Sequence, residues 1–255
     1  MAQRAVDLLV LVCHEDDELY CAGTVKKYTD AGLAVGVVYL TQGGQGHPLM
    51  SEEQTKRIRV EEARKACAIL ATQPPEFLDY PDAFVPYSQN LTLEVTNLIR
   101  KYRARAVVTH NLNTTQTDHR NAALCVMDSV MLLGLPNVKT EYPPFNGFRE
   151  IYCMPQSARK MPGQAELPVI YVDVSDVIET VEACACCYQS QIEAKAMSWR
   201  VPADGKIPDN LPACYPGVIE RDERAGKACG VKYAEVFETV FGAGNFAHDT
   251  LPIQR

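Results

Sequence analysis

The clearest indication of the fold is the segment Val6-Asp7-Leu8-Leu9-Val10-Leu11-Val12-Cys13-His14-Glu15-Asp16-Asp17-Glu18. Its first half is an apolar run rich in valine and leucine, which predicts a strand buried inside a parallel sheet. The polar cluster that follows then lies at the carboxyl end of that strand, where α/β proteins bind their ligands. One imidazole beside adjacent carboxylates calls for a compensating cation, and imidazole plus carboxylate is a ligand set of catalytic zinc.

Strand and helix patterns alternate along most of the chain. Strands are predicted at 6–12, 35–40, 77–80 and 104–109, and helices at 22–31, 52–70, 92–102 and 118–133. Gly32 ends the first of these helices and Ser51 begins the second. Further along we expect strands at the sheet edge at 151–154 and 169–174, helices at 176–195 and 233–241, and a proline-rich loop at 201–217.

This alternation predicts an α/β fold, namely a Rossmann-like, doubly wound and mostly parallel sheet. The simplest organisation is a single domain over residues 1–255. About residues 1–175 form the sheet core in this scheme, and about residues 176–255 form a C-terminal helix, loop and cap.

Composition restricts the classes of partner. The chain is 47% hydrophobic and 22% charged, which is typical of a globular protein. Its formal net charge of −7 argues against nucleic acid and anionic membranes as general partners. It contains no apolar run long enough to insert into a membrane and no signal-peptide pattern at its start, so we expect a cytoplasmic protein.

The ten cysteines are expected to be thiols in that compartment. Cys67, Cys125 and Cys153 stand at apolar-patterned positions and are predicted to be core residues. The cluster at 184–187 lies on a predicted helix, where residues two apart point in different directions. Core packing is therefore the better interpretation of that cluster than a cysteine-only metal site.

Three polar segments, at 14–18, 41–46 and 110–119, follow predicted strands, and the topology predicts that they converge at one edge of the sheet. Each has a simpler alternative. Acids at 15–17 favour the dipole at a helix N-terminus without any catalytic role, although that explanation does not require His14. The segment at 110–118 has the composition of a hydrogen-bonded surface turn.

The order of several short motifs resembles that of the LmbE/PIG-L family of zinc-dependent N-acetyl amino-sugar deacetylases. The matching segments are His14-Glu15-Asp16-Asp17-Glu18, Thr41-Gln42-Gly43, Ile58-Arg59-Val60-Glu61-Glu62-Ala63, Asp79-Tyr80-Pro81-Asp82, Asp118-His119-Arg120, Tyr188-Gln189-Ser190-Gln191 and Tyr233-Ala234-Glu235-Val236-Phe237. Each is weak alone, but together they are specific and cover most of the chain.

The resemblance implies that His14, Asp17 and His119 hold zinc, with Asp16 as the general base and Asp118 beside the ligands. Two nitrogens and one carboxylate would leave an open position for water. The same ligands accept ferrous iron or another divalent metal. The implied reaction is hydrolysis of an N-acetyl group, with Asp16 taking the proton of the attacking water.

The resemblance also implies that Arg59 and Asp82 bind sugar hydroxyls. A surface ion pair of Arg59 with Glu62, or a turn-capping role for Asp82, is an equal alternative.

Two positions depart from the family pattern. Glu15 stands where the family usually has proline, and Gln116 stands where many members have a second histidine. Glutamine can donate a hydrogen bond but cannot carry a proton. Gln116 and Asn113 are candidate substrate-binding residues, and Asn113, His110 or His248 could supply the missing donor.

The leading hypothesis is therefore a metal-dependent hydrolase that removes the N-acetyl group from an amino sugar or a sugar-containing metabolite. The alternatives are an amidase acting on a thiol-sugar conjugate and a non-catalytic carbohydrate-binding homologue. A nucleotide-binding Rossmann protein is disfavoured because no G-x-G-x-x-G motif follows the first strand. Specificity is expected in the loops at 44–50, 84–91 and 197–217. A homo-oligomer could form through Tyr142, Phe145 and Phe148.

Overall fold

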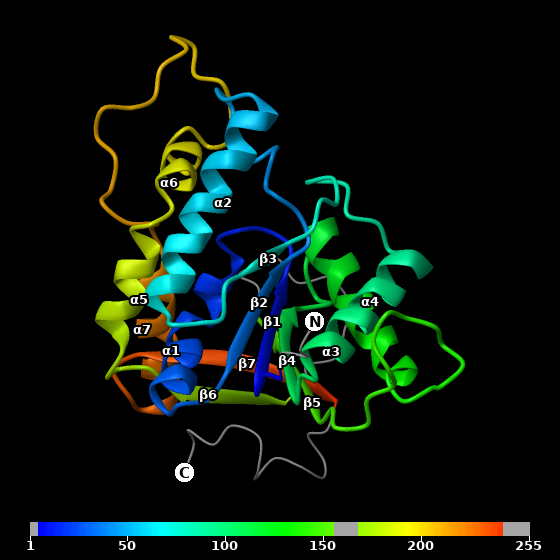
Figure 1. Cartoon of the computed structure of the whole chain (residues 1–255). Coiled ribbons are helices and arrows are strands. Elements are labelled where there is room, and N and C mark those ends of the chain that lie inside the picture. The colour runs from blue at the N-terminus through cyan, green and yellow to red at the C-terminus, as the bar shows by residue number, and fades with distance from the viewer. Residues whose placement is uncertain (1–4, 156–167, 242–255) are drawn as a thin grey trace.

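The computed structural model describes residues 5–155 and 168–241, in which seven strands form one sheet of order β3-β2-β1-β4-β5-β7-β6 (Figure 1). The strands are β1 (Leu8–Val12), β2 (Val35–Tyr39), β3 (Glu76–Phe77), β4 (Ala106–His110), β5 (Glu150–Met154), β6 (Val169–Asp173) and β7 (Ala234–Phe241). β1 to β5 are parallel, and β7 runs antiparallel to both β5 and β6. The predicted α/β fold with a mostly parallel sheet is thus confirmed.

The helices cover both faces of the sheet. They are η1 (Asp17–Tyr20, a 3-10 turn), α1 (Ala22–Asp30), α2 (Glu52–Ile69), α3 (Gln89–Tyr102), α4 (Thr117–Leu132), α5 (Ile178–Ala185), α6 (Gln189–Ala196) and α7 (Val218–Cys229). In Figure 1, α3 and α4 lie on one side of the sheet, and α1, α2, α5 and α7 lie on the other.

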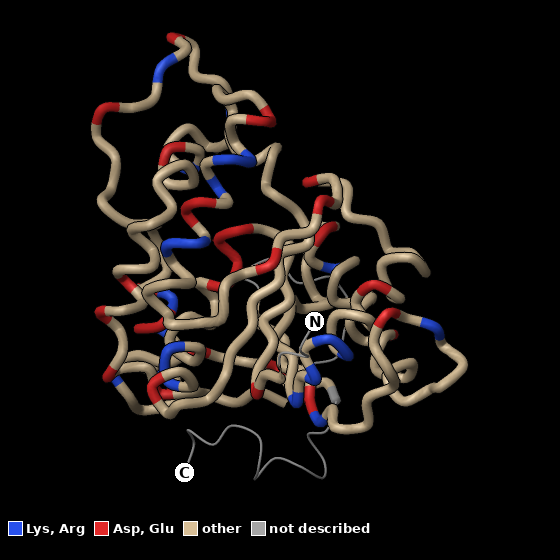
Figure 2. Tube along the Cα trace, viewed as in Figure 1, with Lys and Arg blue, Asp and Glu red and all other residues tan. Residues whose placement is uncertain are grey.

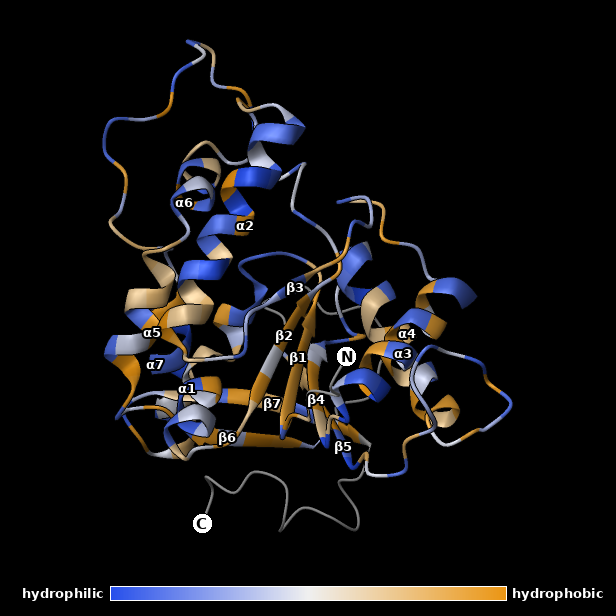
Figure 3. Cartoon of the chain, viewed as in Figure 1, coloured by the Kyte–Doolittle hydropathy of each residue, from blue (hydrophilic) through white to orange (hydrophobic). Residues whose placement is uncertain are grey.

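The central strand β1 explains why the sheet is covered twice. Its five residues are fully buried, and alternate residues contribute to two separate cores. Leu8, Val10 and Val12 pack under α1, α2 and α5, whereas Leu9 and Leu11 pack under α3 and α4. Figure 3 shows the resulting concentration of hydrophobic residues on the strands.

The topology also fixes where a ligand can bind. β1 pairs with β2 on one side and with β4 on the other, so the order in which strands are added to the sheet reverses between β1 and β4. Such a switch point leaves a crevice at the carboxyl ends of the two central strands. β1 ends just before Cys13 and β4 ends just before Asn111. The polar segment that begins with His14 therefore lies at this crevice, and so does the segment that leads from β4 to His119. Figure 2 shows Asp and Glu residues above these strand ends.

Local sequence explains the helix that borders this crevice. Ser51 begins α2 with a capping box, in which its hydroxyl accepts from the backbone N–H of Gln54 while the Gln54 side chain accepts from the N–H of Ser51. The helix is anchored so that Arg59, two turns later, faces the crevice and is only 2% exposed.

Several sequence-based predictions for the second half of the chain are wrong. The segment 233–241 is strand β7 and not a helix, and β5 lies inside the sheet instead of at its edge. The predicted helix 176–195 is broken into α5 and α6, with Cys186 to Tyr188 between them, and α7 was not predicted. Pairing with β5 and β6 decides β7, because its local sequence, which begins Ala234-Glu235, also suits a helix.

The cysteine prediction holds for the core and fails at one pair. Cys67, Cys125 and Cys153 are buried thiols, as expected. Cys186 and Cys214, however, form a disulfide that joins the α5–α6 turn to the loop before α7. A pairing between positions 28 residues apart cannot be recognised from spacing alone.

Phe145 was expected to contribute to a homo-oligomer interface. It is 7% exposed and packs in the core under α3 and α4, so it does not offer a surface to another chain. In the part of the chain that the structure describes, no helix is both long and apolar enough to cross a membrane.

Candidate active site

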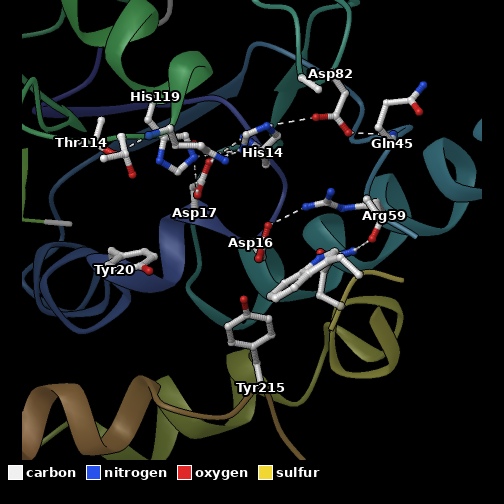
Figure 4. Close-up of a pocket in the computed structure, with 16 residues that line it drawn as sticks. His14, Asp16, Asp17, Tyr20, Gln45, Arg59, Asp82, Thr114, His119 and Tyr215 are labelled. Carbon is white, nitrogen blue, oxygen red and sulfur yellow. Dashed lines mark hydrogen bonds and ion pairs between the residues drawn. The ribbon is translucent and has the colours of Figure 1, made fainter. Parts of the chain in front are cut away.

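Three side chains meet at the carboxyl ends of β1 and β4 (Figure 4). His14 Nδ1 lies 3.1 Å from His119 Nε2 and 3.1 Å from Asp17 Oδ2, and His119 Nε2 lies 3.3 Å from Asp17 Oδ1. All three residues are buried. The backbone N–H of His14 donates to Asp17 Oδ2 at 2.7 Å, which closes the tight turn that brings the two ligands together.

This arrangement fits a divalent cation. Zinc binds histidine nitrogen and carboxylate oxygen at about 2.0 to 2.2 Å in tetrahedral geometry, which separates neighbouring ligand atoms by a little more than 3 Å. Two imidazole nitrogens that face each other at 3.1 Å otherwise share at most one proton between them. A cation also compensates the buried carboxylates gathered here.

Carboxylates hold His14 from its other side. Its Nε2 lies 3.1 Å from Asp82 Oδ1 and 3.4 Å from Asp118 Oδ2. Asp82 Oδ2 accepts from the backbone N–H of Gln45 at 2.8 Å, and Asp118 Oδ1 accepts from that of Val85 at 3.1 Å. A metal-binding histidine typically donates its second N–H to a carboxylate, which fixes its tautomer and ring orientation.

His119 is positioned by a different contact. Its ring stacks on that of His110, with centroids 3.7 Å apart and planes 8° apart. His110 Nε2 accepts the backbone N–H of Cys13 at 2.9 Å, and burial, reinforced by nearby His119, lowers the pKa of His110 well below its usual range. His110 is therefore a neutral packing partner in the interior and does not line the crevice.

The predicted general base lies beside the cluster in an ion-paired group. Arg59 Nη2 donates to Asp16 Oδ1 at 2.5 Å, while Arg59 Nε lies 3.3 Å from Glu15 Oε2. Burial raises the pKa of the Asp16 carboxyl, and the Arg59 guanidinium opposes that rise. Among the described residues, Asp16 Oδ2 has no hydrogen-bond partner, so this oxygen is available to a ligand.

A loop glycine makes the Arg59 arrangement possible. Gly43 has a φ of +61°, and a Cβ there would lie 2.2 Å from Glu15 Oε2 and 2.6 Å from Arg59 Nη1. Any side chain at this position would displace the arginine or the glutamate. Gln191 Nε2 on α6 donates to the Gly46 carbonyl at 3.1 Å and so holds the same loop.

Together these groups line one pocket of about 490 Å³. Its walls come from every polar segment that was predicted to converge. The lining residues are His14, Asp16, Asp17, Tyr20, Gln45, Gly46, Arg59, Asp82, Ala83, Thr114, Thr115, Gln116, His119, Gln191, Trp199 and Tyr215. Such a mixture of acids, imidazoles, amides and aromatic rings suits a polar small molecule.

Comparison with known proteins finds a family model that matches part of the chain. The model of the PIG-L family, described as GlcNAc-PI de-N-acetylase, matches residues 9–130, which contain His14, Asp16, Asp17 and His119. The chain is 29% identical to a diacetylchitobiose deacetylase of Thermococcus kodakarensis over 192 residues, covering 72% of this chain and 69% of that protein.

Two solved structures share the fold of this chain. An N,N'-diacetylchitobiose deacetylase from Pyrococcus horikoshii, in complex with an inhibitor, has a TM-score of 0.73 and 23% identity, with 96% of this chain and 87% of that chain covered. A 4-carboxy-2-hydroxymuconate hydratase from Pseudomonas putida has a TM-score of 0.68 and 20% identity, with coverages of 94% and 97%. At these identities the likeness establishes the fold alone.

The structure brings most of the predicted site residues together. His14, Asp16, Asp17, Arg59, Asp82, Gln116 and His119 line the pocket, and Asp118 lies behind His14. Asn113 is in the same loop but does not line the pocket; its backbone N–H donates to Asn111 Oδ1. The expected alternative partner of Arg59, Glu62, instead accepts from the N–H and hydroxyl of Ser190. His248 lies outside the described residues.

Sequence reasoning did not assign a role to Tyr20, Gln191, Trp199 or Tyr215, which also line the pocket. Three of these residues could have been predicted from the sequence. Gln191 falls in a segment that resembles the family, and Trp199 and Tyr215 belong to the loop at 197–217, which was expected to carry specificity. Nothing in the sequence shows that the latter loop folds back over the ends of β1 and β4.

Proposed function

We propose that this chain is a metal-dependent deacetylase that removes the N-acetyl group from an N-acetylated amino sugar. The observation that carries the proposal is the close approach of His14, Asp17 and His119 beside the Asp16 carboxylate: the two imidazole nitrogens lie 3.1 Å apart, and each lies 3.1 or 3.3 Å from one oxygen of Asp17. The match of residues 9–130 to the PIG-L family model and the similarity to a diacetylchitobiose deacetylase support the same substrate class.

The chain's own residues divide the work. A divalent cation held by the three ligands, zinc or ferrous iron, would lower the pKa of bound water toward about 7 and polarise an amide carbonyl. Asp16 Oδ2 accepts the proton of the attacking water while Oδ1 stays bonded to Arg59. After the acetamide carbon becomes tetrahedral, Asp16 returns this proton to the amine nitrogen, which leaves as acetate is released.

Hydrogen-bond donors can stabilise the negative charge that develops on the former carbonyl oxygen. Gln116 lines the pocket and carries two amide N–H groups. The Tyr215 hydroxyl points toward Asp16 in Figure 4 and has no hydrogen-bond partner among the described residues. We propose that these two groups act where the family pattern has a second histidine, with Asp16 as the proton carrier.

The test is acetate release from N,N'-diacetylchitobiose by wild-type protein and by Asp16→Asn. The variant should keep its metal content, because Asp16 is not a ligand, and should lose at least about 100-fold in kcat. Asp30→Asn, an exposed aspartate of α1, is the matched control and should behave as wild type. Full activity in Asp16→Asn would contradict the assigned base, and bound metal without any turnover in the wild type would favour a binding protein.

A further inference from the structure

One wall of the pocket is aromatic and comes from a segment unrelated to the metal ligands. Trp199 and Tyr215 both belong to the loop between α6 and α7, and both line the pocket. Figure 4 places Tyr215 on the far side of Asp16 from His14 and His119. A ligand whose acetamido group reaches Asp16 would therefore extend along these rings.

The backbone at Trp199 is strained. Ser198 has a φ of 53° and Trp199 a φ of 51°, so two successive residues with side chains are in the left-handed region. Each costs about 1 to 2 kcal/mol relative to a right-handed conformation. Hydrogen bonds to the last turn of α6 hold them there, with Trp199 N–H donating to the Ala194 carbonyl at 2.8 Å. Residues held in this conformation occur at many helix ends and are also concentrated at binding sites.

The Trp199 indole contributes little to the packing of the core. Trp199 is 51% exposed, although a tryptophan normally buries most of its large ring. Most other residues of this pocket are charged or polar. A ligand that contacts both the exposed indole and these polar side chains needs an apolar face and a polar edge. A pyranose ring has these two features, with C–H groups on its faces and hydroxyls around its rim.

Tyr215, unlike Trp199, is fixed by contacts within the protein. The Trp199 indole is therefore the aromatic face that is available to a ligand. The Tyr215 N–H donates to the Ala185 carbonyl at 2.9 Å, and the Cys186–Cys214 disulfide anchors the preceding residue. Lys195 Nζ covers the tyrosine ring at 4.4 Å from its centroid and donates to the Pro216 carbonyl. One face of Tyr215 is thus occupied, while its hydroxyl faces the pocket.

We propose that Trp199 is a specificity-determining residue whose indole stacks on a sugar ring of the substrate. This rests on the proposed deacetylase function for the choice of substrate, but binding at Trp199 can be observed without turnover. The substrate class that follows is an N-acetylated pyranose, and a simple acetamide without a ring would gain nothing from this wall.

The chain's single tryptophan makes a direct test possible. In Asp16→Asn protein, which should bind without turning over, N,N'-diacetylchitobiose should change Trp199 fluorescence in a saturable manner. N-methylacetamide, which has the amide but no ring, should leave the emission unchanged. If calorimetry shows that the disaccharide binds while the emission stays constant, the proposal is wrong. Absence of acetate release by the wild type would instead count against the proposed function alone.

Kinetics provide the second arm. Trp199→Ala should raise KM for the disaccharide about tenfold with little change in kcat, and Trp199→Phe should restore most of the loss. Val201→Ala is the matched control, because Val201 is 66% exposed in the same loop and does not line the pocket. Circular dichroism checks that each variant is folded. An unchanged KM in folded Trp199→Ala would overturn the proposal.

Discussion

The role of Asp82 separates two explanations of this site. The family resemblance assigns it to sugar hydroxyls, whereas the structure places one oxygen 3.1 Å from His14 Nε2 and bonds the other to the backbone of Gln45. Both oxygens are therefore engaged within the protein. We expect Asp82 to act through the metal ligand His14, so Asp82→Asn should weaken metal binding.

The magnitude follows from what the substitution removes. The charge-assisted bond to His14 becomes a neutral one, which is about half as strong, and the amide N–H₂ of asparagine opposes one of the two donors. A loss of about 1.4 kcal/mol corresponds to tenfold in the dissociation constant. Changes to groups that orient metal ligands typically cost 10- to 100-fold, so we expect about tenfold.

The assay is competition for Zn²⁺ against a chromophoric chelator. Asp79→Asn is the control, since Asp79 is exposed in the same segment and contacts Lys56 and Gln42 instead of the site. At saturating metal, Asp82→Asn should recover most of its kcat. An unchanged metal dissociation constant together with a raised KM would refute this argument and restore the substrate-binding role.

Three further predictions concern stability and turnover. Burial raises the pKa of Glu235 to about 7 in the folded chain. Between pH 4.5 and 7 this carboxyl therefore binds more protons in the folded state than in the unfolded state, so its contribution to the unfolding free energy should fall by about 3 kcal/mol across that range. Urea titrations of chelated protein should accordingly show a flatter pH profile for Glu235→Gln. Gly43→Ala should destabilise the chain in thermal melts by more than Gly32→Ala, because both have positive φ but only Gly43 meets other side chains; equal losses would mean that the contact with Arg59 is unimportant. Tyr215→Phe should lower kcat about 100-fold at unchanged KM, and a normal kcat would remove its hydroxyl from the proposed mechanism.

The sequence was most informative where local pattern and topology coincide. The apolar run of β1 predicts a doubly covered strand, and the residues after it must then lie at the sheet edge, so the pairing of His14 with Asp17 could be anticipated. The convergence of His119 needed only the assumption that β4 lies beside β1, which the structure confirms.

Long-range pairing is what the sequence could not provide. β7 is a strand because β5 and β6 hydrogen-bond to it, and the Cys186–Cys214 disulfide joins segments whose proximity depends on the break between α5 and α6. The roles of Arg59 and Asp82 were unclear for the same reason, since their partners lie 43 and 68 residues away and either side chain could equally face solvent.

The proposed deacetylase function depends on a cation held by His14, Asp17 and His119. The most direct measurement is acetate release from N,N'-diacetylchitobiose by one preparation as purified, after chelation, and after reloading with Zn²⁺ or Fe²⁺, with metal content followed in parallel. We predict that activity disappears on chelation and returns as one cation per chain is restored. Activity that survives complete removal of metal would contradict the account.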